Sequence, residues 1–167
     1  AAVTATDIDG DGRPDVVAAG YEEDAVAWFR RTDDGWTRHD VHELDGAFAI
    51  LAHDLDADGD PDLVAASRTS GRVLWYENTR GESDGGPPGF VPRLLLQEEH
   101  AEPASVDAAD VDGDGGVDVI VAFTYRPEIR VMLNPGGGGE GLGGPTLVVP
   151  VPGNGVSWVR ARDFDGD

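Results

Sequence analysis

One nine-residue pattern occurs three times in the chain and constrains its fold more than any other feature. The pattern reads D-x-D-x-D-G-x-x-D, with acids at positions 1, 3, 5 and 9 and glycine at position 6. Alternate residues of a tightly curled loop can point inward together, and glycine allows the sharp bend. Four carboxylates this close repel one another unless a cation lies among them. The pattern therefore predicts metal-binding loops rather than plain solvated turns.

Hard carboxylate oxygens at this density favour Ca²⁺, with the backbone carbonyl at position 7 as a further ligand. We expect one ion in each complete loop, three in all, and a fourth, partial site at the C-terminus, where the pattern begins again. The predicted metal ligands are Asp7, Asp9, Asp11, Arg13 and Asp15 in the first loop, Asp54, Asp56, Asp58, Asp60 and Asp62 in the second, Asp110, Asp112, Asp114, Gly116 and Asp118 in the third, and Asp163, Asp165 and Asp167 in the partial copy.

The negative charge of the chain is concentrated in the same segments. The 167 residues contain 33 acids and 12 bases, a formal net charge of −21, and 16 of the acids lie in these four segments. This balance argues against nucleic-acid binding, which needs clustered Lys and Arg.

The absence of Cys excludes disulfides and thiolate metal sites. No apolar run reaches the roughly 18 residues of a membrane span, so we expect no membrane insertion.

The residues that follow each loop exclude an EF-hand. That calcium loop has a bidentate Glu at position 12 and continues into a helix. Here position 12 is Ala18, Ala65 or Val121. The adjoining residues are short, apolar and β-branched, which is typical of strands. Each loop is therefore predicted to join two strands.

The loops recur at a spacing that indicates a repeat protein. They start at residues 7, 54, 110 and 163, so the spacings are 47, 56 and 53 residues. Each complete unit offers four strand-like segments: one before the loop, one after it, an aromatic third and a variable fourth. Four short strands in a unit of this size are typical of a β-propeller blade. The sequence therefore predicts an all-β fold of four-stranded antiparallel blades, with repeats at 1–45, 46–99, 100–152 and a truncated fourth at 153–167.

Loops of the form D-x-D-G-D-G-x-x-D, followed by a strand such as Val73-Leu74-Trp75-Tyr76-Glu77-Asn78, resemble the FG-GAP/VCBS repeats of integrin α-subunit-like propellers. The resemblance implies that Ca²⁺ lies in the hairpin between the first and second strands of each blade. Two departures stand out. The second loop has Ala57 at position 4, and the third unit has Val131 and Met132 in place of an aromatic pair, which implies a differently packed blade.

Three blades are fewer than the 4–8 that close a propeller. We therefore expect the chain to be part of a larger ring, or several copies to assemble into one. Two glycine-rich stretches, 81–89 and 135–145, are expected to form surface loops between third and fourth strands. The aromatic residues of the third strands are expected to form an inter-blade core: Trp28, Phe29, Trp75 and Tyr76.

The expected function is that of a calcium-stabilised interaction module for extracellular recognition or adhesion, located outside the cell or on its surface. Its ligand is a protein or a glycan. The alternatives are a lectin-like propeller and the non-catalytic portion of a propeller carbohydrate lyase or dehydratase. No catalytic residue is predicted, because no histidine has zinc-ligand spacing: the four are His39, His42, His53 and His100.

Overall fold

The structure is a computed structural model that describes residues 2–80, 87–135 and 142–162. In these ranges it contains twelve strands and no helix, so no helix there is long and apolar enough to cross a membrane. The strands are β1 (Ala2–Thr6), β2 (Asp15–Gly20), β3 (Ala25–Thr32), β4 (Gly35–Glu43), β5 (Ala47–His53), β6 (Asp62–Ser67), β7 (Arg72–Asn78), β8 (Phe90–Gln97), β9 (Pro103–Ala109), β10 (Asp118–Phe123), β11 (Glu128–Met132) and β12 (Thr146–Pro150).

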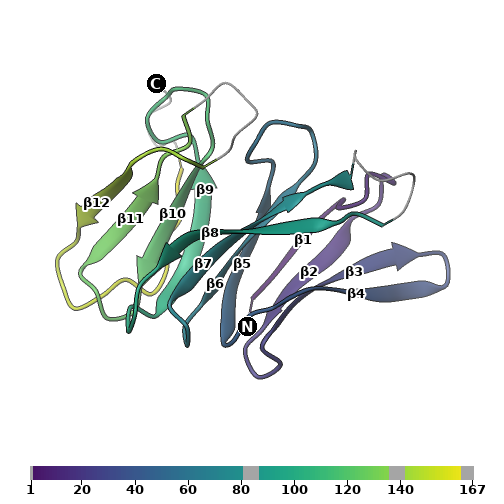
Figure 1. Cartoon of the computed structure of the whole chain (residues 1–167), viewed down its shortest axis with the longest axis horizontal. Helices are drawn as coiled ribbons and strands as arrows, with labels where there is room; N and C mark the ends of the chain where they lie inside the picture. Colours follow the sequence, from purple (N-terminus) through teal and green to yellow (C-terminus); the bar gives the residue numbers. More distant parts are fainter. Residues whose placement is uncertain (1, 81–86, 136–141, 163–167) are drawn as a thin grey trace.

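The strands form three four-stranded antiparallel sheets, each built from four consecutive strands. Figure 1 shows the sheets arranged side by side as a fan, with β5 of the middle sheet against β1 and β9. The first strand of each sheet therefore lies at the inner side of the fan, and β4, β8 and β12 lie at the outer side. This arrangement confirms the predicted all-β fold with propeller-type blades. The three sheets do not close into a ring.

A core of apolar side chains joins the first sheet to the second. Trp28 of β3 and Tyr76 of β7 are buried in it, together with Ile8 of the first loop and Leu63 and Leu74 of the second sheet. Because side chains alternate across a strand, Tyr76 faces the first sheet while its neighbour Trp75 faces the third. Phe29 is half-buried and belongs to neither core, since it points away from the second sheet.

A second core joins the second sheet to the third. Trp75 lies there with Phe123 and Met132, all at most 5% exposed. The third unit thus fills its side of this interface with Met132, at the register position that Tyr76 occupies in the second unit. The expected inter-blade role is confirmed for Trp28, Trp75 and Tyr76, whereas Phe29 packs in neither core among the described residues.

The final described residues run back toward the inner side of the third sheet. The Val156 amide donates to the Phe123 carbonyl at 2.8 Å, and the Ala161 amide donates to a carboxylate oxygen of Asp107 at 2.7 Å. This segment therefore lies beside β9. Most of the two glycine-rich stretches, and the acids Asp163, Asp165 and Asp167 of the partial loop, fall outside the described residues.

Candidate metal centres

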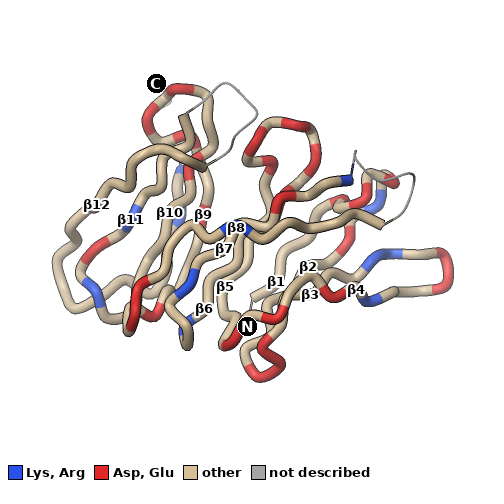
Figure 2. The backbone as a smooth tube through the Cα atoms, viewed as in Figure 1, with Lys and Arg blue, Asp and Glu red and all other residues tan. Residues whose placement is uncertain are grey.

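The three acidic loops are the connections β1–β2, β5–β6 and β9–β10. Figure 2 shows their acidic residues gathered at the same end of the three sheets. The first strand leads into each loop, and the last aspartate of each loop is the first residue of the next strand. The loops therefore join the first and second strands of each sheet, as the resemblance implied.

The aspartate at position 1 organises each loop by accepting backbone hydrogen bonds. In the first loop, Asp7 accepts from the amides of Asp11 at 3.1 Å and Gly12 at 2.8 Å. Both carboxylate oxygens of Asp7 therefore accept a backbone hydrogen bond, and the loop backbone curls around this side chain. Asp54 accepts the same two bonds in the second loop, from Asp58 (3.2 Å) and Gly59 (3.0 Å). In the third loop Asp110 accepts from Gly113 at position 4 (2.7 Å) and from Gly115 (3.0 Å).

Two loop positions require a left-handed backbone. At position 6, Gly12, Gly59 and Gly115 have φ of 83°, 95° and 89°. Position 4 is also left-handed, and there the second loop has an alanine, Ala57, at φ 61°. A left-handed conformation costs an L-residue about 1–2 kcal/mol, whereas glycine adopts it freely. The second loop is therefore strained at position 4, where the other two loops have glycine.

The aspartate at position 9 is fully buried in all three loops: Asp15, Asp62 and Asp118 are 0% exposed. In the second loop, one oxygen of Asp62 accepts from the Leu55 amide at 3.1 Å and the other accepts from the Asn78 amide at 2.8 Å. These two bonds tie the loop to the third strand of its own sheet. The equivalent bonds are Ile8 to Asp15 (3.3 Å), Arg31 to Asp15 (2.8 Å), Val111 to Asp118 (2.8 Å) and Asn134 to Asp118 (2.8 Å).

The electrostatics of these carboxylates favour a bound cation. Burial raises the pKa of Asp62 to about 7, although its two amide donors act in the opposite direction. Burial also raises the pKa of Asp15. At Asp56, burial and the neighbouring Asp58 charge both raise the pKa. A divalent ion among these oxygens would offset the cost of burying and crowding their charges.

Each loop brings three of its predicted ligands together, with one oxygen from each residue within 4.8 Å of the others. Hard oxygen donors in this number suit Ca²⁺, which takes further oxygens from backbone carbonyls and water. The chemistry of the donor set therefore fits the ion. The groups are Asp7, Asp9 and Asp15; Asp54, Asp56 and Asp58; and Asp110, Asp112 and Asp118.

The remaining predicted ligands lie outside these groups. The position-5 acids Asp11 and Asp114 and the position-9 Asp62 are not among the three grouped residues of their loops. At position 7, where the carbonyl was the expected ligand, the Arg13 side chain pairs with Asp33 at 2.7 Å. The other two position-7 residues, Asp60 and Gly116, are buried, and Asp60 forms an ion pair with Arg80.

A comparison with protein families identifies the type of repeat. The profile of the FG-GAP-like repeat matches residues 7–65, 54–121 and 110–167, and each match begins at the first aspartate of a loop. The chain belongs to the FG-GAP-like repeat family. A search of curated proteins finds no match. The three FG-GAP-like repeats thus cover the chain from Asp7 to its last residue, and each acidic loop opens one of them.

Two asparagines that the sequence analysis did not single out link the acidic loops of successive FG-GAP-like repeats. The side-chain amide of Asn134 donates to the Leu55 carbonyl of the second loop at 2.6 Å and to the Val117 carbonyl of its own loop at 3.3 Å. Asn78 makes the same pair of bonds one repeat earlier, to Ile8 at 3.2 Å and Pro61 at 3.1 Å. The only sequence signal is their shared spacing of 24 residues from the first aspartate of the loop.

Proposed function

We propose that this chain is a calcium-stabilised interaction module that serves extracellular recognition or adhesion. The observation that carries the proposal is the gathering of three aspartate oxygens within 4.8 Å in every loop. Calcium satisfies such clusters with flexible coordination by six to eight oxygens. The three ions would reduce the formal charge from −21 to −15, and they would reduce the repulsion within the acidic loops, where the negative charge is concentrated.

The ions would act on the fold, because each loop is connected to three strands. It joins the first strand to the second, and its buried last aspartate accepts an amide hydrogen bond from the third, as Asp62 does from Asn78. Extracellular calcium modules bind at about 10⁻⁴–10⁻³ M, which suits a surface or secreted protein. We therefore place the module outside the cell or on its surface.

Calcium binding is tested by isothermal titration of the chelator-treated chain. The proposal predicts saturable binding of calcium and much weaker binding of magnesium, which prefers a tighter octahedron and keeps its waters. The matched control is the variant D7N/D54N/D110N, which removes one charge from each acidic group without changing side-chain size. Equal heats for the chain and for this variant would contradict the assignment.

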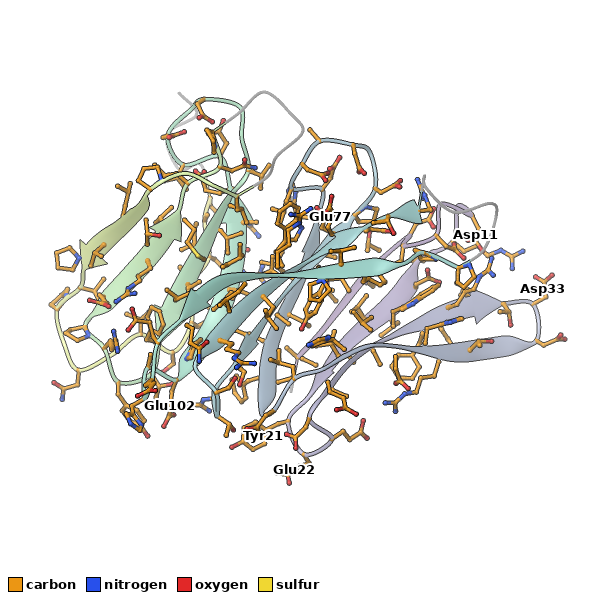
Figure 3. The ribbon with its side chains drawn as sticks, viewed as in Figure 1. Asp11, Tyr21, Glu22, Asp33, Glu77 and Glu102 are labelled. Carbon is orange, nitrogen blue, oxygen red and sulfur yellow. The ribbon has the colours of Figure 1, made fainter. Side chains whose placement is uncertain are left out.

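A second candidate function is glycan binding, and one cavity favours it. The cavity has a volume of about 400 Å³ and lies among turns contributed by all three sheets. Figure 3 shows two of its residues, Tyr21 and Glu102, at the end of the sheets opposite Asp11. Exposed aromatic rings beside hydrogen-bonding side chains suit a sugar, which has an apolar face and hydroxyl edges. The lining residues are Tyr21, Arg68, Thr69, His100, Glu102 and Tyr125.

The backbone around this cavity adds a reason to test it. His100 and Glu102 both have left-handed backbones, with φ of 60° and 44°, and neither is glycine. Strain of this kind is concentrated at binding sites, where the surrounding structure holds it in place. Arg68 is held beside the cavity by a 2.7 Å hydrogen bond to Thr124 and by the face of the Phe48 ring, 4.3 Å from the guanidinium carbon.

A glycan array separates the two candidate functions. The calcium-loaded chain is compared with Tyr125→Ala, which removes a ring that is 67% exposed at the cavity, and with Trp36→Ala, which removes a 56% exposed ring on β4. Glycan binding that is lost in the first variant and kept in the second supports the lectin-like function. No glycan binding leaves protein recognition as the proposed role. Among the described residues, no histidine joins a metal-holding group, so nothing there favours the enzymatic alternative.

The open side of the third sheet is the proposed contact for a neighbouring blade. Position 2 of the first and second loops, Ile8 and Leu55, is at most 2% exposed because the following sheet covers it, whereas Val111 at the same position of the third loop is 49% exposed. We propose that either a further blade of the same ring or another copy of the chain covers this side. Analytical ultracentrifugation distinguishes the two, since only self-assembly changes the mass with concentration.

A further inference from the structure

The three repeats share their loop acids but differ in one residue that lies in the third strand or just after it. This residue follows the first aspartate of the loop by 23 positions and is Arg30, Glu77 or Leu133. The sequence therefore supplies the first loop with a cation, the second with an acid and the third with a neutral side chain. Glu77 is itself paired with Arg93, through the Nε at 2.7 Å.

The guanidinium of Arg30 lies against the acids of the first loop. Its Nε is 2.5 Å from Oδ2 of Asp9, and its NH2 is 3.6 Å from Oδ2 of Asp11. The Asp9 side chain is only 8% exposed, so this ion pair is partly sheltered from water and poorly screened. Asp9 is one of the three grouped residues of the first loop, and Arg30 therefore holds a carboxylate that calcium would use.

A second guanidinium borders the same loop. Arg80, which follows the third strand of the second sheet, packs directly against Gly10 at position 4 of the first loop while it pairs with Asp60. Arg80 thus also borders the second loop, but its partner Asp60 lies outside the grouped acids there. Among the described residues, no arginine forms an ion pair with the grouped acids of the second and third loops, which are Asp54, Asp56, Asp58, Asp110, Asp112 and Asp118.

We infer that Arg30 is a built-in counter-ion that makes the first loop the weakest calcium site and the last to fill. The Arg30 guanidinium pairs with the Asp9 carboxylate when calcium is scarce, and its positive charge repels a calcium ion that approaches the loop. When calcium is too scarce to fill the second and third loops, the first loop still keeps its shape, because the Arg30 guanidinium already offsets the charge of its acids. This inference rests on the proposed binding of calcium by the loops.

The test follows each site separately in the intact chain. The position-6 amides of Gly12, Gly59 and Gly115 each donate to the first aspartate of their own loop, at 2.8, 3.0 and 3.0 Å, so each reports one site. Their nuclear magnetic resonance shifts are recorded while calcium is added to the chelated chain. The expected result is that Gly59 and Gly115 reach their midpoints at lower calcium than Gly12.

The variants then assign the difference to Arg30. Arg30→Leu, which introduces the residue type of the third repeat, should lower the midpoint of Gly12 about tenfold, as Coulomb's law suggests for one charge beside a divalent ion. Arg30→Gln keeps most of the side-chain bulk and should act in the same direction, which guards against a packing effect of leucine. Arg38→Leu is the matched control, because Arg38 pairs with Asp40 at 2.8 Å, outside the loop, and carries the same charge.

The possible outcomes distinguish this inference from the function on which it rests. A Gly12 midpoint that is lowered by both Arg30 variants and unchanged by Arg38→Leu supports the inference. A midpoint that moves equally in all three variants, or a Gly12 signal that saturates first in the unaltered chain, overturns it and leaves calcium binding intact. If none of the three glycines responds to calcium, both the inference and the proposed calcium function are wrong.

Discussion

The Asn134 side chain donates a hydrogen bond of 2.6 Å to the Leu55 carbonyl oxygen, and this bond ties the end of the third sheet's β11 strand to the acidic loop of the second sheet. The two residues are 79 positions apart in the sequence. Leu55 itself is buried in the core between these sheets. The acidic loop of the second repeat is therefore held in place by the repeat that follows it.

This relationship predicts a measurable loss of stability for Asn134→Ala. The change leaves the buried Leu55 carbonyl without its partner, and an unpaired buried acceptor costs about 1–3 kcal/mol. Urea unfolding at fixed calcium concentration measures the loss. Asn154→Ala, at an exposed position, is the control and should change the free energy of unfolding by less than about 0.5 kcal/mol. Equal effects of the two substitutions would show that the link between repeats adds no stability.

The strain at Ala57 predicts that glycine stabilises the second loop. Ala57→Gly removes a left-handed cost of about 1–2 kcal/mol and adds about 0.5–1 kcal/mol of unfolded-chain entropy, so the net gain is roughly 0.5–1 kcal/mol. Ala18→Gly, in the middle of β2, lacks the first effect and should destabilise the chain by roughly 0.5–1 kcal/mol. Thermal melts of both variants provide the comparison. A loss of stability in Ala57→Gly contradicts the strain argument.

The second loop also predicts an order among its acids. Asp54→Ala and Asp58→Ala remove members of the grouped carboxylates, whereas Asp60→Ala removes only the partner of Arg80. Removing a residue that contacts a metal ligand typically lowers metal affinity by about 10–100-fold. Asp60→Ala should therefore lower calcium affinity by about tenfold, and the other two substitutions should each lower it by more than about 100-fold. Isothermal titration with calcium measures all three. Equal losses would mean that Asp60 belongs among the direct ligands.

The strands and loops were predictable because their signals are local. Short runs of apolar, β-branched residues mark the strands after the loops, and closely spaced Asp and Gly residues mark the connections, as in the segment from Asp110 to Asp118. The role of Asn134 was not predictable in this way, because its partner lies in another repeat and the sequence shows only a shared spacing. Arg30 was missed for a similar reason: its charge matters only because β3 directs it toward Asp9, in a loop about 20 residues earlier.

The partial burial of Phe29 was not predictable for the same reason. Its sequence neighbour Trp28 and its counterpart Tyr76 are both buried in the core between the first two sheets. Residue type alone therefore favoured burial for Phe29 as well. Its burial depends on whether a sheet covers the face of β3 on which it lies, and among the described residues the second sheet covers the opposite face. Whether both rings of an aromatic pair are buried therefore depends on the sheets that cover the two faces of the strand.

The central claim is that calcium stabilises this fold, and thermal melting in chelator, magnesium and calcium tests it most directly. Binding to the folded state contributes about 1.4 kcal/mol for each site when the ion is at 10 times its Kd. Three such sites should raise the Tm by about 10 °C for a chain of this size. We predict a rise of this order in millimolar calcium and little change in magnesium relative to chelator. The same Tm in all three solutions would contradict the account and would leave the loops as acidic turns.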